Sequence, residues 1–388
     1  MAKLGNPRFQ PERLTEARDF VGMTKRHLAS LAGLSEQSIS NYERGVSNPQ
    51  DDVIDRLSGS LHVKREFLLT PAWPEKDDHI FWRTMRSDTA QSQRRTGVLL
   101  RWIKESIHTL EEYIELPEYR IPTLNFPNWK RLSDEDIEHA AEFVRSAWGF
   151  GRHPVPDVTL AFENAGIPVV AFSAENRKQA GFMHRSEKLG RPIVGVNLFE
   201  QSLARQRFSL AHELGHVLLH ESVTLTETRT PEINKRIEQQ AHRFAGAFLF
   251  PRAAFEKEIY DYSLEEFAAL KRSWGISIMA QVVRARDLGM ISEDQTFDLF
   301  RKATRKGYRR PLGEPWDAEL PLEEPRLLRR CVEVIDQEGG DLLADFLSDY
   351  TLPAFAMSDI LKHPLTMPER EIEDNVITLR PRSIGTRT

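Results

Sequence analysis

The chain has 388 residues, of which 40% are hydrophobic and 29% are charged. This composition is typical of soluble globular proteins and excludes a fibrous repeat or wholesale disorder. The length predicts two or three domains at about 150 residues each. The formal net charge of −5 gives no overall basic field, so any nucleic-acid site must be local. The single cysteine, Cys331, excludes a disulfide framework and any multi-cysteine metal site.

The N-terminal residues lack the apolar stretch of a signal peptide, and no run approaches the about 20 apolar residues of a membrane span. A lone thiol also fits a reducing compartment. We therefore expect a cytoplasmic protein that has no membrane partner.

The first segment, residues 7–69, is predicted to form short helices. In TKRHLASLAGLSEQSISNYERG (24–45), Thr24 and Ser35 are expected helix caps and Gly33 is the expected tight turn between two helices. The small Ala29 suits a close helix crossing, and Ile39 is expected in the core behind the second helix. This arrangement predicts a helix-turn-helix module with a five-helix fold.

The second helix of this pair is expected to aim its first-turn side chains at a DNA groove. The candidates for base edges are Glu36, Gln37, Ser38 and Asn41, and those for phosphates are Lys25 and Arg44. Residues 1–70 carry 10 Lys/Arg and 9 Asp/Glu, a net charge of +1. This weak balance predicts modest affinity per module and a homodimer. A helical bundle used for protein contacts is the alternative.

Residues 11–69, including the YERG sequence and the following Pro49, resemble the Cro/C1-type (XRE) helix-turn-helix family. The resemblance implies that this segment binds a double-stranded DNA operator.

A long amphipathic helix or helix pair is predicted over residues 81–115. Its basic residues include Arg94, Arg95, Arg101 and Lys104. They form either a solvated connector face or extra phosphate contacts, and the helix is equally suited to signalling between two modules.

From residue 133 the pattern is mixed. Helices are predicted over 134–148 and 157–166, and short strands over 167–172, 180–184 and 192–197. Long helices are predicted from Leu203 and over 232–250, with further helices over 263–300. The tail from residue 326 has a helical stretch and an apolar LPAFAM sequence (352–357), which forms either a surface patch or part of a core.

The strongest chemical signal is HELGH, residues 212–216. On a helix, His212 and His216 lie one turn apart on the same face, where two imidazoles can bind one tetrahedral metal ion. Glu213 between them can act as the general base of a hydrolase. The alternative is two helix-surface histidines beside a core seam.

A zinc hydrolase needs a third protein ligand and keeps a fourth position open. Glu238 on the second long helix is the candidate ligand, and His242, one turn later, is expected to orient a ligand from behind. His220 is expected to cap the helix or support His216, because a further ligand would close the open position.

RQRFSLAHELGHVLLH (205–220), IEQQAHRFAGAFLFP (237–251) and WGISIMAQVVRARDLGMIS (274–292) together resemble the ImmA/IrrE family of metallopeptidases over residues 120–310. The resemblance implies a zincin-like fold, metal binding by His212, His216 and Glu238, and a general base at Glu213. Many members have an acidic residue where this chain has Gln240, which leaves Glu238 as the acidic ligand of the motif. Zinc is the expected metal, and Mn²⁺ or Fe²⁺ suit the same donors.

The predicted fold is mainly α and multi-domain, with an α+β zincin-like domain that has a small sheet. The predicted division is a helix-turn-helix domain (1–70), a linker helix (71–120), a metallopeptidase domain (121–312) and a C-terminal region (313–388) that senses a signal, dimerises or covers the cleft. The family resemblance implies a regulator that cleaves itself or a partner repressor under stress or mobile-element control. The alternatives are an antitoxin that binds a toxin, a ligand-sensing transcription factor without proteolysis, and a housekeeping peptidase.

Overall fold

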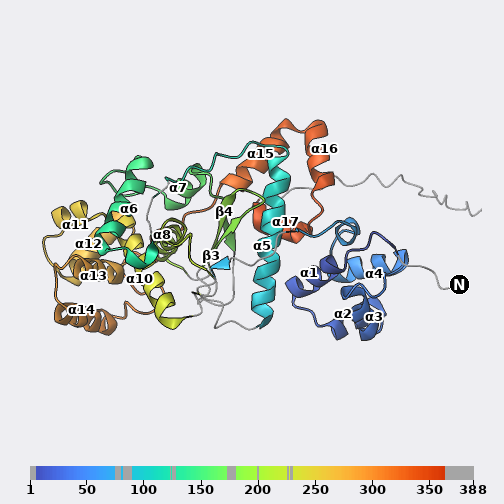
Figure 1. The fold of residues 1–388 in the computed structure, drawn as a ribbon, viewed down its shortest axis with the longest axis horizontal. Coiled ribbons are helices and arrows are strands. Elements are labelled where there is room, and N and C mark those ends of the chain that lie inside the picture. The colour runs from blue at the N-terminus through green and yellow to red at the C-terminus, as the bar shows by residue number, and fades with distance from the viewer. Residues whose placement is uncertain are drawn as a thin grey trace, which may run out of the picture.

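The computed structural model describes residues 6–74, 80–81, 90–122, 124, 128–172, 181–198, 201–224, 227 and 230–362 (Figure 1). Over these residues the predicted fold class is confirmed. The chain is mainly helical, with a helical N-terminal module, an α+β region around a small sheet, and helices in the C-terminal region.

The N-terminal module consists of α1 (Pro11–Val21), α2 (Lys25–Ala32), α3 (Glu36–Glu43), α4 (Asp51–Leu61) and the 3₁₀ helix η1 (Glu66–Leu69). The predicted caps are present: Thr24 accepts a hydrogen bond from the His27 amide at 3.1 Å, and Ser35 accepts one from the Ser38 amide at 3.0 Å. Gly33 adopts a φ of +64°, which favours glycine. The fifth helix of the prediction is the short 3₁₀ helix.

Four strands form the sheet, in the order β1-β3-β4-β2. Their bounds are β1 (Ile80–Phe81), β2 (Val169–Phe172), β3 (Gly181–Ser186) and β4 (Arg191–Asn197). β3 is antiparallel to both β1 and β4, and β2 is parallel to β4, with Val169 opposite Val194. The predicted strands are thus present. β1 was not predicted, because two residues are too few to show an alternating pattern.

Further helices form a bundle that meets one face of the sheet, and one of the helices in contact with the strands carries the HELGH motif. The helices of the bundle are α6 (Asp134–Ala147), α7 (Val158–Asn164), α8 (Leu203–Leu219), α10 (Pro231–Leu249), α11 (Arg252–Glu258), α12 (Leu264–Trp274), α13 (Ile278–Asp287) and α14 (Glu293–Arg305), with the 3₁₀ helix η3 (Trp129–Arg131). α8 and α10 approach closely at Gly215, where an added Cβ would lie 3.2 Å from the Ala241 Cα. This spacing brings the side chains of the two helices into contact beside the glycine.

Successive strand residues point to opposite faces of the sheet, and each face belongs to a different core. Val169, Met183 and Val194 pack into the core that includes α8 and α10. Val170 and Phe182 pack into a second core with the N-terminal module. α5 (Ala90–Glu111), α15 (Leu327–Glu338), α16 (Gly340–Asp349) and α17 (Ala354–Leu361) complete that second core. In Figure 1, α5 runs between the N-terminal module and the sheet.

α5 packs along one side, while its basic residues Arg94 and Arg95 are exposed. Val98, Trp102 and Ile103 are buried on it, and so is Lys104. Arg101 forms an ion pair with Glu16 of α1 at 2.8 Å. The first part of the predicted helix, residues 82–89, lies outside the described residues.

The apolar LPAFAM sequence is largely buried. Phe355 stacks on Phe20 of α1 with the ring centroids 5.5 Å apart and lies 6.2 Å from the Trp102 ring. The C-terminal helices therefore share a core with α1 and α5. Among the described helices, none has the length and apolarity that crossing a bilayer requires.

Candidate metal centre and nucleic-acid interface

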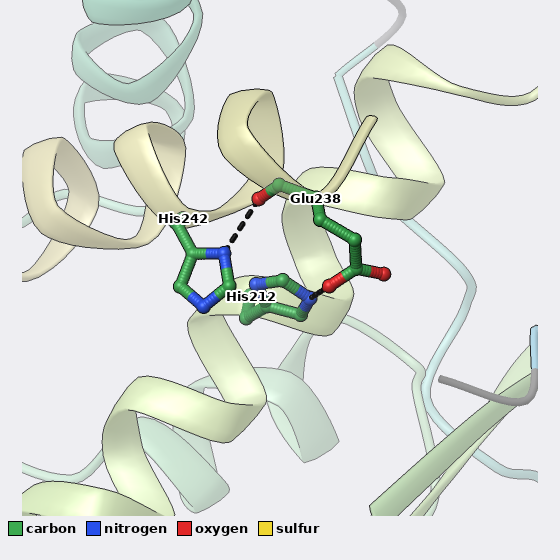
Figure 2. Close-up of side chains that lie close together, drawn as sticks. All are labelled: His212, Glu238 and His242. Atoms are coloured by element: carbon green, nitrogen blue, oxygen red, sulfur yellow. Dashed lines mark hydrogen bonds and ion pairs between the residues drawn. The ribbon is translucent and has the colours of Figure 1, made fainter. Parts of the chain in front are cut away.

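α8 and α10 bring the predicted metal ligands together. The Nε2 atoms of His212 and His216 lie 2.9 Å apart. The two carboxylate oxygens of Glu238 lie 3.5 Å from the His212 Nε2 atom and 3.6 Å from the His216 Nε2 atom. Both imidazoles are buried, and Glu238 is partly buried. Figure 2 shows the Glu238 carboxylate facing His212 from the neighbouring helix.

These separations fit a metal ion. Two ligands at 2.0–2.1 Å from a tetrahedral zinc ion are about 3.3 Å apart, and the three measured distances bracket that value. Two imidazole nitrogens and a carboxylate oxygen are also a common donor set of zinc hydrolases. The described residues thus include a group able to hold a divalent ion.

A chain of hydrogen bonds lies behind His216. Its Nδ1 atom lies 3.0 Å from the His220 Nδ1 atom, and the His220 Nε2 atom lies 2.9 Å from the Gln240 Oε1 atom. The Gln240 amide nitrogen donates to the Trp129 carbonyl at 3.0 Å. Since a carbonyl only accepts, this bond fixes the orientation of the Gln240 amide.

The proton positions follow from that orientation. Gln240 Oε1 accepts from the Nε2–H of His220, which leaves the His220 Nδ1 atom as an acceptor. His216 therefore donates its Nδ1–H, and its Nε2 atom carries the lone pair that a metal needs. Burial lowers the pKa of His220 to about 4, against an opposing effect of the Gln240 hydrogen bond, so the ring is neutral near pH 7.

His242 lies on the same face of α10 as Glu238, one turn later. Its Nδ1 atom lies 2.6 Å from the Glu238 backbone carbonyl, which only accepts, so Nδ1 carries the proton (Figure 2). Ligand atoms of His242, His212 and Glu238 all lie within 4.8 Å of one another. His242 thus presents its Nε2 lone pair beside the metal ligands and holds the Glu238 main chain.

Glu213 follows His212 on α8 and is also buried, at 6% exposure. Gln240 and the Trp129 carbonyl were not identified from the sequence as parts of the site. Gln240 is two residues from Glu238, where helical geometry points it to a different side of α10, so only its contact with His220 reveals its part.

The candidate DNA-contacting residues lie on and beside α3, at the far side of the N-terminal module from the sheet (Figure 1). The side chain of Gln37 donates to Asn41 Oδ1 at 2.9 Å, and Arg44 donates to the same atom at 2.8 Å. Ser38 shares a 2.8 Å hydrogen bond with the cap Ser35.

The other two candidates differ in their surroundings. Glu36 is exposed in the first turn of α3. Lys25 forms an ion pair with Glu43 at 2.9 Å, so part of its charge is compensated within the module. A phosphate contact by Lys25 would have to compete with Glu43.

Comparison with known proteins agrees with this geometry. Residues 14–68 match a helix-turn-helix family model, and residues 162–286 match the M78 peptidase model described as an IrrE N-terminal-like domain. The chain is also 27% identical over 101 residues to the HTH-type transcriptional regulator ImmR of Bacillus subtilis. That match covers 26% of this chain and 67% of the relative. The chain therefore joins an XRE-type helix-turn-helix module to an IrrE N-terminal-like domain of the M78 metallopeptidases.

Proposed function

We propose that this protein is a transcriptional regulator whose IrrE-like domain is a zinc-dependent endopeptidase. A signal, from stress or from a mobile element, triggers cleavage of the protein itself or of a partner repressor. The observation that carries the proposal is the convergence of His212, His216 and Glu238 beside Glu213. A binding module alone has no need for a buried carboxylate next to a metal ligand.

The residues of the site have different roles in peptide hydrolysis. A zinc ion held by the two histidines and Glu238 would supply Lewis-acid chemistry and activate water. Glu213 accepts the proton of the attacking water and delivers it to the leaving amine. His220 and Gln240 keep His216 in the tautomer that exposes its Nε2 lone pair.

The N-terminal module supplies the regulatory half of the proposal. Glu36, Gln37, Ser38 and Asn41 read base edges from α3, while Arg44 and Lys25 contact phosphates. The likeness to a regulator named ImmR supports a role in transcription. A homodimer places two α3 helices on a palindromic operator, which compensates for the modest charge of each module.

The Glu213→Gln variant of the full chain tests the peptidase proposal. It keeps the shape of the side chain and removes the base, so we expect metal and operator binding to persist and cleavage to stop. The readouts are elemental analysis, DNA mobility shift, and mass spectrometry of the protein and its candidate repressors after induction. Elemental analysis also decides between zinc, Mn²⁺ and Fe²⁺.

Identical fragments and identical gene induction from the wild type and Glu213→Gln would overturn the peptidase proposal. The IrrE-like domain would then be a binding module, as in an antitoxin or a ligand sensor. Unchanged transcription from its own promoter after deletion of the protein would instead overturn the regulatory half and favour a housekeeping peptidase.

A further inference from the structure

A cavity of about 380 Å³ opens directly beside the candidate metal ligands. Its wall includes Phe208 of α8 and His242 of α10, whose ring centroids lie 5.8 Å apart. The His242 ring also lies 4.6 Å from the His212 ring, centroid to centroid. His242 therefore lines the cavity and also lies against a candidate metal ligand.

The helix faces that hold the metal ligands continue into the cavity. Along α10, Glu238, His242 and Gly246 follow at intervals of four residues, which places them on one face. Along α8, Phe208 precedes His212 by the same interval. A peptide that lies across the metal ligands can thus reach the cavity with a neighbouring side chain.

The cavity lining is largely apolar. Its apolar side chains come from α8, α13 and α14 and are Phe208, Met279, Ala280, Val283 and Phe300. Gly246 contributes no side chain, so the α10 wall stays open next to Arg284. The volume lies at the lower end of the range of about 300–1,000 Å³ for small-molecule pockets, which suits one or two amino-acid side chains.

Of the charged side chains that line the cavity, all but one are paired with a neighbouring residue of the described part of the chain, and the exception is an arginine. Arg284 is paired with Glu138 at 2.6 Å, and Arg243 is paired with Asp134 at 3.0 Å. The carboxylate of Asp287 is paired with Arg286. Arg309 lines the cavity, is exposed, and makes no ion pair or hydrogen bond with the residues that the structure describes. Its charge is therefore available to a ligand.

We propose that this cavity selects the peptide substrate by a bulky apolar side chain next to the scissile bond, with an adjacent acidic residue that pairs with Arg309. The proposal rests on the peptidase function proposed above. It defines the substrate class as a peptide in which leucine, methionine or phenylalanine adjoins aspartate or glutamate.

Peptide binding tests the cavity without relying on cleavage. The probe is a set of fluorescein-labelled octapeptides in which an alanine background carries Leu-Glu, Leu-Lys or Ser-Glu, each in both orders. They are titrated by fluorescence anisotropy against zinc-loaded, full-length Glu213→Gln protein. We expect the Leu-Glu peptide to bind about tenfold more tightly than Ser-Glu and about threefold more tightly than Leu-Lys.

Two variants in the same background assign those preferences to residues. Ala280→Phe fills the cavity, so the preference for leucine over serine should disappear. Arg309→Glu should reverse the preference for glutamate over lysine. Arg305→Glu, an exposed arginine of α14 outside the cavity, is the matched control and should leave both preferences intact.

Equal binding of all peptides overturns the proposal, and so does a preference that Arg309→Glu and Ala280→Phe both leave unchanged. Should Ala280→Phe fail to fold, the surface variant Arg309→Glu still decides the charge preference. The two proposals fail separately. Selective binding without cleavage by the wild type overturns the peptidase function alone, and cleavage without sequence preference overturns the cavity alone.

Discussion

Two buried polar clusters of this protein are built from different partners. At the junction of α1 and α5, Arg13 pairs with Glu16 at 3.1 Å and with Glu105 at 2.6 Å, and Arg101 also pairs with Glu16. Between α8 and α10, the Glu238 carboxylate faces two imidazoles. The positive charges of the first cluster belong to arginines, which are always protonated, whereas the imidazole rings of the second cluster are cationic only when protonated.

The difference separates a structural cluster from a functional one. A carboxylate that meets a guanidinium is neutralised within the protein and anchors the helices it joins. Imidazole nitrogens and a carboxylate that converge at metal-ligand spacing are suited to an external cation. Substitutions should therefore act on folding at the first cluster and on metal binding at the second.

The largest effect should come from Arg13→Met. The change leaves the partly buried Glu105 without its arginine partner and removes one of the partners of the buried Glu16. Breaking a buried pair costs about 3–5 kcal/mol of unfolding free energy. Urea denaturation measures this loss, and metal content per folded chain should stay the same. Arg8→Met, at an exposed arginine nearby, is the control and should change stability by less than about 0.5 kcal/mol.

Glu238→Ala should have the opposite result, in which metal binding is lost and the folding stability is kept. It removes the acidic ligand, so zinc affinity should fall by more than the roughly 10- to 100-fold loss typical of a ligand's hydrogen-bond partner. Competition with a chromophoric chelator measures the affinity, and operator binding should persist. Glu232→Ala on the exposed first turn of α10 is the control. Unchanged zinc affinity in Glu238→Ala would remove this residue from the metal site.

Gln240→Leu tests the hydrogen-bond chain behind His216, because the Gln240 side chain does not itself contact a metal ligand. Without the Gln240 amide, His220 no longer fixes the His216 tautomer, and zinc affinity should fall by about 10- to 100-fold. The neighbouring Gln239→Leu is exposed and should have no effect. Equal zinc affinities of the two variants would show that the hydrogen-bond chain does not position His216.

The smallest effect is expected at Glu163, a buried carboxylate whose partners are backbone amides. Glu163 accepts hydrogen bonds at 2.9 Å from the Arg326 and Leu327 amides, at the start of α15. Burial raises the pKa of Glu163 to about 7, although these hydrogen bonds oppose the shift. A raised native pKa means that its contribution to stability is complete below the unfolded value of 4.5 and is lost as the pH rises through about 7.

Glu163→Gln should therefore match the wild type near pH 4.5 and be the more stable protein at pH 8, where the buried Glu163 carboxyl group of the wild type is ionised. Urea titrations at several pH values measure the difference. A wild-type stability that does not fall between these pH values, relative to the variant, would contradict the assignment to Glu163.

Local signals made much of this fold predictable. Thr24, Gly33 and Ser35 mark helix ends through bonds within a few residues, so the sequence shows them directly. The spacing of His212 and His216 likewise depends on one helix alone. Glu238 is the one ligand candidate from elsewhere in the chain, and the clear periodicity of the second long helix indicates it.

Long-range packing was not predictable in the same way. From the sequence, Gln240 shows only the absence of an acidic residue, because its contact with His220 depends on how α8 and α10 cross. The position of Phe355 against Phe20 joins segments from opposite ends of the chain, and no local pattern encodes that contact. The cavity beside His242 likewise forms only where four helices, α8, α10, α13 and α14, pack together.

The shared core of α1, α5 and the C-terminal helices has a consequence for synthesis. A ribosome makes α1 and α5 long before α17. The rings of Phe20 and Trp102 therefore lack their contact with Phe355 until most of the chain has emerged. A nascent or truncated chain exposes these aromatic surfaces, and chaperones and proteases act on such exposed apolar surface. Quality control in the cell would thus remove incomplete copies whose N-terminal module could otherwise occupy the operator.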